Sequence, residues 1–133
     1  MGEVHVKARL TNAVDEALVR RGTLTADRVR SYEADAVVDT GATRTVLPPE
    51  IAERLGLAIR GRRVVTDADG HQEELSVTEP LVVEIAGDDT LDEALVLGNQ
   101  VLIGQTVLEK LNLLVDCEGG RLIPNPRRPA SRV

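Results

Sequence analysis

Short apolar runs, separated by turn-forming residues, constrain the fold of this chain more than any other feature of its sequence. Over residues 3–10 polar and apolar side chains alternate, which is the period of a β-strand with one buried face. Asp69-Gly70 stands between two further strand-like stretches, and an Asp-Gly pair in that position is a strong hairpin signal. The pattern predicts about eight short strands with two or three short helices, and therefore a mostly-β single domain.

Turn and cap residues give the approximate positions of these elements. A helix is expected from Asn12 to Gly22, because Asn12 can cap its N-terminus and Gly22 can end it. A second helix is expected between residues 48 and 56, where a proline pair opens it, and a third at residues 105–111. The strands are expected at residues 4–10, 32–38, 46–47, 64–68, 71–77, 81–85, 91–97, 113–117 and 121–123.

The side chains available for a core are almost entirely aliphatic. The chain has 18 Val, 17 Leu and 5 Ile, but no Phe, no Trp and a single aromatic residue, Tyr32. Val and Ile pack well on a pleated sheet, so this composition favours strands. A chain of 133 residues can bury a core without disulfides. We therefore expect one domain at residues 1–126, followed by a C-terminal tail at 127–133.

Charge and cysteine content exclude several classes of function. Sixteen Lys plus Arg against 22 Asp plus Glu give a net charge of −6, which provides no attraction to nucleic acid. No window approaches the roughly eighteen apolar residues of a membrane span. A single cysteine, Cys117, excludes an intrachain disulfide and a cysteine-based zinc cluster. Since the N-terminus also lacks the layout of a secretory signal, we expect a cytoplasmic protein.

Residues 36–43, AVVDTGAT, give the strongest indication of chemistry. Asp39 follows an apolar strand, where a carboxylate is partly withdrawn from water. Thr40 can donate a hydrogen bond that fixes its geometry, and Gly41 allows another backbone to approach closely. A simple turn is the competing interpretation, because Asp and Gly are common turn residues and a three-residue match arises often by chance.

A second signature favours the functional interpretation. Leu102-Ile103-Gly104 places two apolar residues and a glycine directly before the third expected helix. The two signatures in this order, with the Asp69-Gly70 hairpin between them, resemble the retropepsin-like aspartic proteases, the single-domain relatives of retroviral proteases and pepsins. The resemblance covers roughly residues 32–123. It implies a closed β-barrel with a flap hairpin, assembled as a symmetric homodimer.

The resemblance also implies roles for individual residues. The catalytic positions are Asp39, Thr40 and Gly41: Asp39 would act on the substrate, Thr40 would interlock with its symmetry mate, and Gly41 would face the substrate backbone. Residues 64–77 would form the flap. The positions implied to contact substrate lie beside the catalytic motif, at the flap tip and in the second signature, and are Ala42, Thr43, Ala68, Asp69, Gly70, His71 and Ile103.

A single motif in the chain implies an active site shared by two chains. Peptide hydrolysis by this chemistry needs two carboxylates that share a proton. Asp116 also follows an apolar strand but lacks the Thr-Gly context, so it is expected to be an ordinary strand-end or turn acid. We therefore expect a homodimer that places Asp39 beside its copy and acts on peptide or protein substrates.

Two positions depart from the viral pattern and leave an alternative open. Retroviral members commonly carry an acid and an arginine where this chain has Thr43 and Gln105, and the joint loss leaves no orphan charge. This departure and the polar flap tip keep open a catalytically silent dimerisation or peptide-binding module. Neither the Asp67–Gly70 stretch nor His5 and His71 have the spacing of metal ligands, so no metal and no cofactor are expected.

Overall fold

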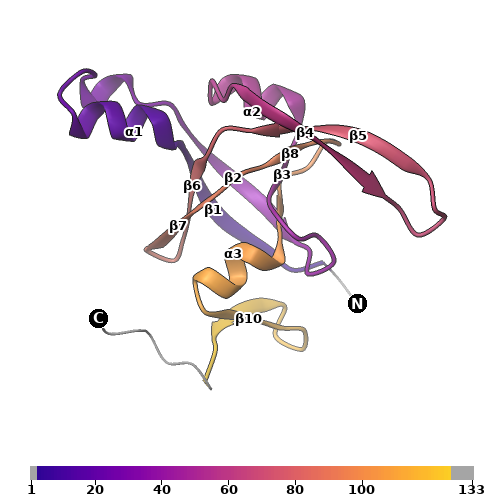
Figure 1. Cartoon of the computed structure of the whole chain (residues 1–133). Coiled ribbons are helices and arrows are strands. Elements are labelled where there is room, and N and C mark those ends of the chain that lie inside the picture. Colours follow the sequence, from indigo (N-terminus) through magenta and orange to yellow (C-terminus); the bar gives the residue numbers. More distant parts are fainter. Residues whose placement is uncertain (1–2, 127–133) are drawn as a thin grey trace.

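The structure, a computed structural model, describes residues 3–126 (Figure 1). Strands make up 44% and helices 19% of it, so the predicted mostly-β class is confirmed. The helices are α1 (Ala13–Arg20), the short 3-10 helix η1 (Ala26–Arg28), α2 (Pro49–Arg54) and α3 (Gln105–Lys110). The strands are β1 (His5–Asn12), β2 (Ser31–Val38), β3 (Val46–Leu47), β4 (Ile59–Thr66), β5 (Gln72–Thr78), β6 (Leu81–Ile85), β7 (Asp88–Asp92), β8 (Leu95–Val96), β9 (Leu102–Ile103), β10 (Leu113–Asp116) and β11 (Arg121–Pro124).

Nine of these strands form one curled sheet in the order β4-β5-β8-β3-β9-β2-β1-β6-β7. The closed barrel implied by the resemblance is not formed by residues 3–126, because β4 and β7 are the two edges of the sheet and do not pair. The reason is visible in Figure 1, where β4 belongs to a long hairpin with β5 that projects away from the rest of the chain. The sheet is therefore a half-barrel.

Strand β9 lies between two strands that are consecutive in the chain. It pairs in parallel with the end of β2, where Val37 faces Leu102 and Val38 faces Ile103. On its other side it pairs antiparallel with β3 through Val46. The connection from β2 to β3 must therefore pass over the end of β9, where α3 begins. This interleaving brings the two sequence signatures together.

The core beneath the sheet is aliphatic, as the composition predicts. Seventeen buried residues, all aliphatic, form one cluster, and the half-buried Tyr32 is among the side chains packed against it. The largest of its completely buried members come from strands and helices throughout the fold and are Leu10, Leu47, Leu55, Leu81, Ile103 and Leu108.

The segment between β1 and β2 is fixed by buried polar groups. The predicted cap is confirmed, since Asn12 Oδ1 accepts the N–H of Asp15 at 3.0 Å, and Asn12 Nδ2 also donates to the Leu55 carbonyl at 2.8 Å. The buried Asp15 carboxylate accepts two hydrogen bonds from the Arg30 guanidinium, both of 2.9 Å. These bonds hold the pKa of Asp15 below its usual range. Gly22 follows the helix with φ of +77°, the left-handed conformation expected there.

Two of the predicted strand boundaries are wrong. Strand β4 begins at Ile59, before the expected start at residue 64. Nearly all of its side chains are exposed, so its sequence has no apolar alternation to reveal it. The expected strand at 91–97 is two strands, β7 and β8. The turn before β7 falls at Ala86-Gly87, both with positive φ, so β7 begins earlier than expected. Its pairing with β6 ends at residue 92, and β8 begins at residue 95.

The chain ends in the expected hairpin, in which β10 and β11 form a separate two-stranded sheet. It lies beyond α3 from the main sheet in Figure 1. The expected tail at 127–133 lies outside the described residues. Among the helices that the structure describes, none is long and apolar enough to cross a membrane.

Candidate active site

Asp39 stands directly after the last residue of β2 and is half-buried. Its backbone N–H donates to the Ile103 carbonyl at 2.9 Å, which extends the β2–β9 ladder by one residue. Its side-chain Oδ1 accepts the N–H of Gly41 at 2.9 Å, and its carbonyl accepts the N–H of Ala42 at 3.1 Å. The main chain of Asp39 is therefore fixed by β9 and by Ala42, and its carboxylate by the N–H of Gly41.

The loop after Asp39 rests on the start of α3. The Ala42 carbonyl accepts the N–H of Gln105 at 2.8 Å, and the Thr43 carbonyl accepts the N–H of Thr106 at 2.9 Å. These are N–H groups of the first helical turn, which have no partner inside the helix. The structure thus brings the Asp39 motif and the second signature together through two backbone hydrogen bonds, of which one involves Gln105 and the other Thr43.

Gly104 allows this close approach. A Cβ atom at Gly104 would lie 2.6 Å from the Arg44 carbonyl oxygen and 2.8 Å from that of Ala42, well inside ordinary van der Waals contact. Its φ of −92° is open to any residue, so the need for glycine is one of space rather than backbone conformation. The glycine of the second signature therefore sets how closely the Asp39 loop packs against α3.

Asp92 anchors the same loop from the other side, although its sequence context predicts no such role. Its Oδ2 accepts the Thr45 N–H at 2.9 Å and the Thr45 hydroxyl at 2.7 Å, while the Thr106 hydroxyl lies 3.5 Å away. Thr45 is completely buried, so its N–H and hydroxyl groups cannot bond to water, and the Asp92 carboxylate is their hydrogen-bond acceptor. In the sequence Asp92 stands in an ordinary acidic stretch, and no local signal distinguishes it.

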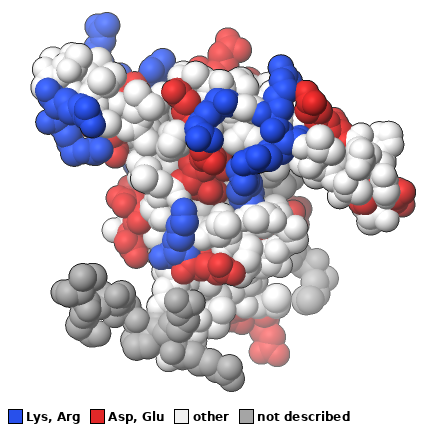
Figure 2. Space-filling model, viewed as in Figure 1, with Lys and Arg blue, Asp and Glu red and all other residues white. Residues whose placement is uncertain are grey.

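The base of the β4–β5 hairpin is tied to the end of the Asp39 loop by a bridging carboxylate. Glu93 pairs with Arg44 at 3.6 Å and with Arg60 at 3.2 Å. Arg44 follows the loop and Arg60 is the second residue of β4, so the hairpin arises next to the candidate site. Figure 2 shows basic side chains gathered on this face of the molecule, from α1 across to the base of the hairpin.

The expected substrate-contacting residues fall into three groups. Thr40, Gly41 and Thr43 are exposed and Ala42 is half-buried, so the Asp39 loop is accessible. The four residues at the hairpin tip, 68–71, are all exposed, and within residues 3–126 no hydrogen bond or ion pair joins them to that loop. Ile103 is completely buried in the core, so its main chain rather than its side chain reaches Asp39.

Asp116 lies apart from this site. It ends β10, and its Oδ1 accepts the N–H of Gly119 at 3.1 Å across the turn to β11. This hydrogen bond and the nearby Arg121, 3.4 Å away, hold the pKa of Asp116 below its usual range. Asp116 is therefore a turn acid, as expected. It does not supply a second carboxylate beside Asp39.

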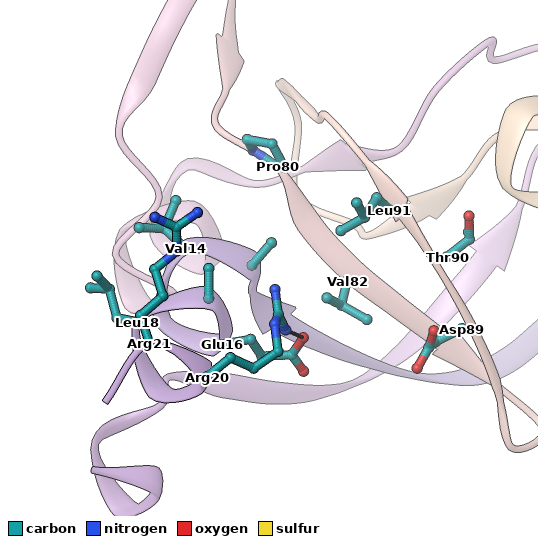
Figure 3. A pocket seen from close by; sticks show the side chains of 12 residues that line it. Val14, Glu16, Leu18, Arg20, Arg21, Pro80, Val82, Asp89, Thr90 and Leu91 are labelled. Atoms are coloured by element: carbon teal, nitrogen blue, oxygen red, sulfur yellow. Dashed lines mark ion pairs between the residues drawn. The ribbon is translucent and has the colours of Figure 1, made fainter. Parts of the chain in front are cut away.

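A groove of about 590 Å³ lies elsewhere, between α1 and the β6–β7 edge of the sheet (Figure 3). Apolar side chains including Val14, Leu18, Val82 and Leu91 line it, with Arg20 at its rim. It contains none of the residues expected to bind substrate. Across residues 3–126, no three His, Cys, Asp or Glu side chains come together in a way that could hold a metal ion.

Comparison with known proteins identifies the family of the chain. The family described as gag-polyprotein putative aspartyl protease matches residues 26–110, a stretch that contains the Asp39 motif, the hairpin, Gly104 and all of α3. The match covers well over half of the chain, which therefore belongs to this family of retropepsin-like aspartyl proteases. No curated protein matches the chain significantly.

Proposed function

We propose that the protein is an aspartic endopeptidase in which two Asp39 carboxylates, one from each chain of a homodimer, hydrolyse a peptide bond. The single observation that carries the proposal is the fixed Asp39 carboxylate, held by the Gly41 N–H on a loop locked against α3. A reacting group that is already held in place loses no free energy to reorganisation during the reaction. Membership of an aspartyl protease family supports the same class of chemistry.

The chemistry follows from placing two such carboxylates side by side. Two carboxylates at that separation do not both ionise, so one proton is shared between them. The ionised carboxylate removes a proton from a bound water, whose oxygen attacks the peptide carbonyl carbon. The protonated carboxylate donates to the carbonyl oxygen, and a proton then passes to the amine nitrogen as the C–N bond breaks. This proton sharing favours activity at acid to near-neutral pH.

The homodimer is part of the proposal because one chain supplies one Asp-Thr-Gly motif. Thr40, Gly41 and Thr43 are exposed in the single chain and are free to meet their copies across a two-fold axis. Sedimentation of the purified protein at tens of micromolar is expected to show a dimer. A protein that is strictly monomeric and still cleaves peptides would overturn the two-chain site.

Substitution of Asp39→Asn tests the mechanism directly. The amide is nearly isosteric but neither acts as a base nor shares a proton, so cleavage of a peptide library is expected to fall by several orders of magnitude. The dimer is expected to survive or to tighten, because two amides do not repel each other. Pepstatin, an inhibitor of aspartic proteases, should reduce cleavage by the wild-type protein.

A matched control lies on the same strand. Asp35 is exposed on β2, 3.7 Å from His5 and away from the loop, so Asp35→Asn should leave cleavage unchanged. Equal cleavage by the Asp39→Asn and wild-type proteins would refute the mechanism. Peptide binding without hydrolysis by the wild-type protein would instead establish the silent peptide-binding module.

A further inference from the structure

The pairing of β4 with β5 sorts the charged side chains of the hairpin onto two faces. Residues that face each other across an antiparallel ladder point to the same side of the sheet, and successive residues point to opposite sides. Leu75, paired with Arg63, and Val77 are both buried, so their side faces the body of the protein. We call this side the inner face of the hairpin.

Arg63 and Glu73 belong to the inner face. Arg63 is opposite Leu75, and Glu73 is opposite Val65, the one half-buried residue of β4. Arg62 and Glu74, one residue away, lie on the outer face, where they form an ion pair of 3.7 Å. The acidic stretch at Glu73-Glu74 is therefore divided by the pleat, with one carboxylate on each side.

The two inner charges are free to interact with a ligand. Within residues 3–126, neither the Arg63 nor the Glu73 side chain has an ion-pair or hydrogen-bond partner, whereas Arg60 and Arg62 are both paired with glutamates. Arg63 and Glu73 occupy neighbouring rungs on one face, a diagonal separation of roughly 7 Å between backbones. They present opposite charges at two distinct positions.

The hairpin is placed to use them. Its base is joined to the Asp39 loop through the Arg60–Glu93–Arg44 bridge, and Figure 1 shows the hairpin extending outward above the loop between β2 and β3. A peptide that binds at Asp39 and extends along the hairpin is expected to meet the inner face, because that is the side on which Leu75 and Val77 pack against the body of the protein. Charges on that face would then meet its side chains directly.

We propose that Arg63 and Glu73 determine substrate specificity, and that the protein selects peptides with an acidic side chain at one position and a basic side chain at another. This inference rests on the proposed function, because it takes the Asp39 loop as the place where peptide binds. Arg63 recognises the acidic side chain and Glu73 the basic one. Such opposite-charge contacts contribute to specificity even where each adds little affinity.

The test compares inner-face variants with matched outer-face controls. A library of decapeptides with an apolar central pair, varied among Glu, Lys and Ala at each flanking position, is digested and sequenced by mass spectrometry. Arg63→Gln is expected to lower the preference for Glu about threefold to tenfold and to leave the preference for Lys intact. Glu73→Gln should do the reverse, while Arg62→Gln and Glu74→Gln should leave both preferences unchanged.

Binding separates this inference from the proposed function. Fluorescein-labelled members of the same library are titrated into the Asp39→Asn protein, with and without Arg63→Gln, and binding is followed by anisotropy. If the wild-type protein does not cleave but the charge preferences appear in binding, the endopeptidase proposal fails and the inference stands. If peptides are cleaved with a profile that Arg63→Gln and Glu73→Gln do not alter, the inference is overturned and the proposed function stands. Absence of both cleavage and binding refutes both.

Discussion

Replacement of Gly104 by alanine tests whether the packing of the Asp39 loop against α3 controls activity. The new Cβ atom would lie 2.6 Å from the Arg44 carbonyl oxygen, 0.8 Å inside the 3.4 Å at which ordinary contact begins. The obstacle is backbone, which does not swing aside as a flexible side chain does. Overpacking of this kind costs about 1–3 kcal/mol, so the thermal midpoint should fall by roughly 5–15 °C.

The effect on catalysis should exceed the effect on stability. Relief of the contact requires the loop to retreat by a large part of an ångström, and Asp39 begins that loop. Misplacement of a reacting group by about 1 Å can cost about a hundredfold in rate, so peptide cleavage should fall by roughly 10- to 100-fold in protein that is still folded. Gly61→Ala is the control, because its Cβ meets nothing within 4 Å. A Gly104→Ala protein with wild-type midpoint and cleavage would refute the reasoning.

The remaining predictions concern the buried polar groups. Asp92→Ala leaves the buried N–H and hydroxyl of Thr45 without their acceptor. Urea unfolding should show that the free energy of unfolding falls by about 2–4 kcal/mol, and peptide cleavage should fall as well. A fall of less than about 0.5 kcal/mol would show that Asp92 does not anchor the loop. Because the pKa of Asp15 is lowered in the folded protein, its contribution is present at pH values above the unfolded pKa of 3.8 and is lost as pH falls through the folded value. In the Asp15→Asn protein the free energy of unfolding should therefore fall less steeply as pH is lowered below 3.8. An unchanged dependence of the free energy of unfolding on pH would contradict a lowered pKa of Asp15.

The parts of the fold that could be predicted are those with local chemical signals. The Asn12 cap and Gly22 define α1 because both act on backbone groups within one helical turn. The hairpin at Asp69-Gly70 follows equally from local turn preference. The Asp39 motif could be recognised because a carboxylate, a hydroxyl and a glycine after an apolar strand form a contiguous pattern.

The parts that could not be predicted depend on residues distant in the sequence. Strand β4 has no buried face, so its pairing with β5 rather than its own composition makes it a strand. Asp92 becomes an anchor only because β7 ends beside Thr45, far from it in sequence. The open half-barrel likewise depends on the direction in which the β4–β5 hairpin leaves the sheet, which no local pattern encodes.

The position of β9 between β2 and β3 makes the support of the Asp39 loop depend on residues 102–110. A polypeptide that has emerged from the ribosome as far as residue 100 already contains the whole Asp39 motif, but lacks the strand that separates β2 from β3 and the helix on which the loop rests. Contacts between residues so far apart form late, because closing a long loop is entropically costly. Nascent and C-terminally truncated chains consequently present the motif without its supporting geometry. For the proposed endopeptidase, a chain that stops at residue 100 is therefore expected to cleave no peptide, although it carries the whole Asp39 motif.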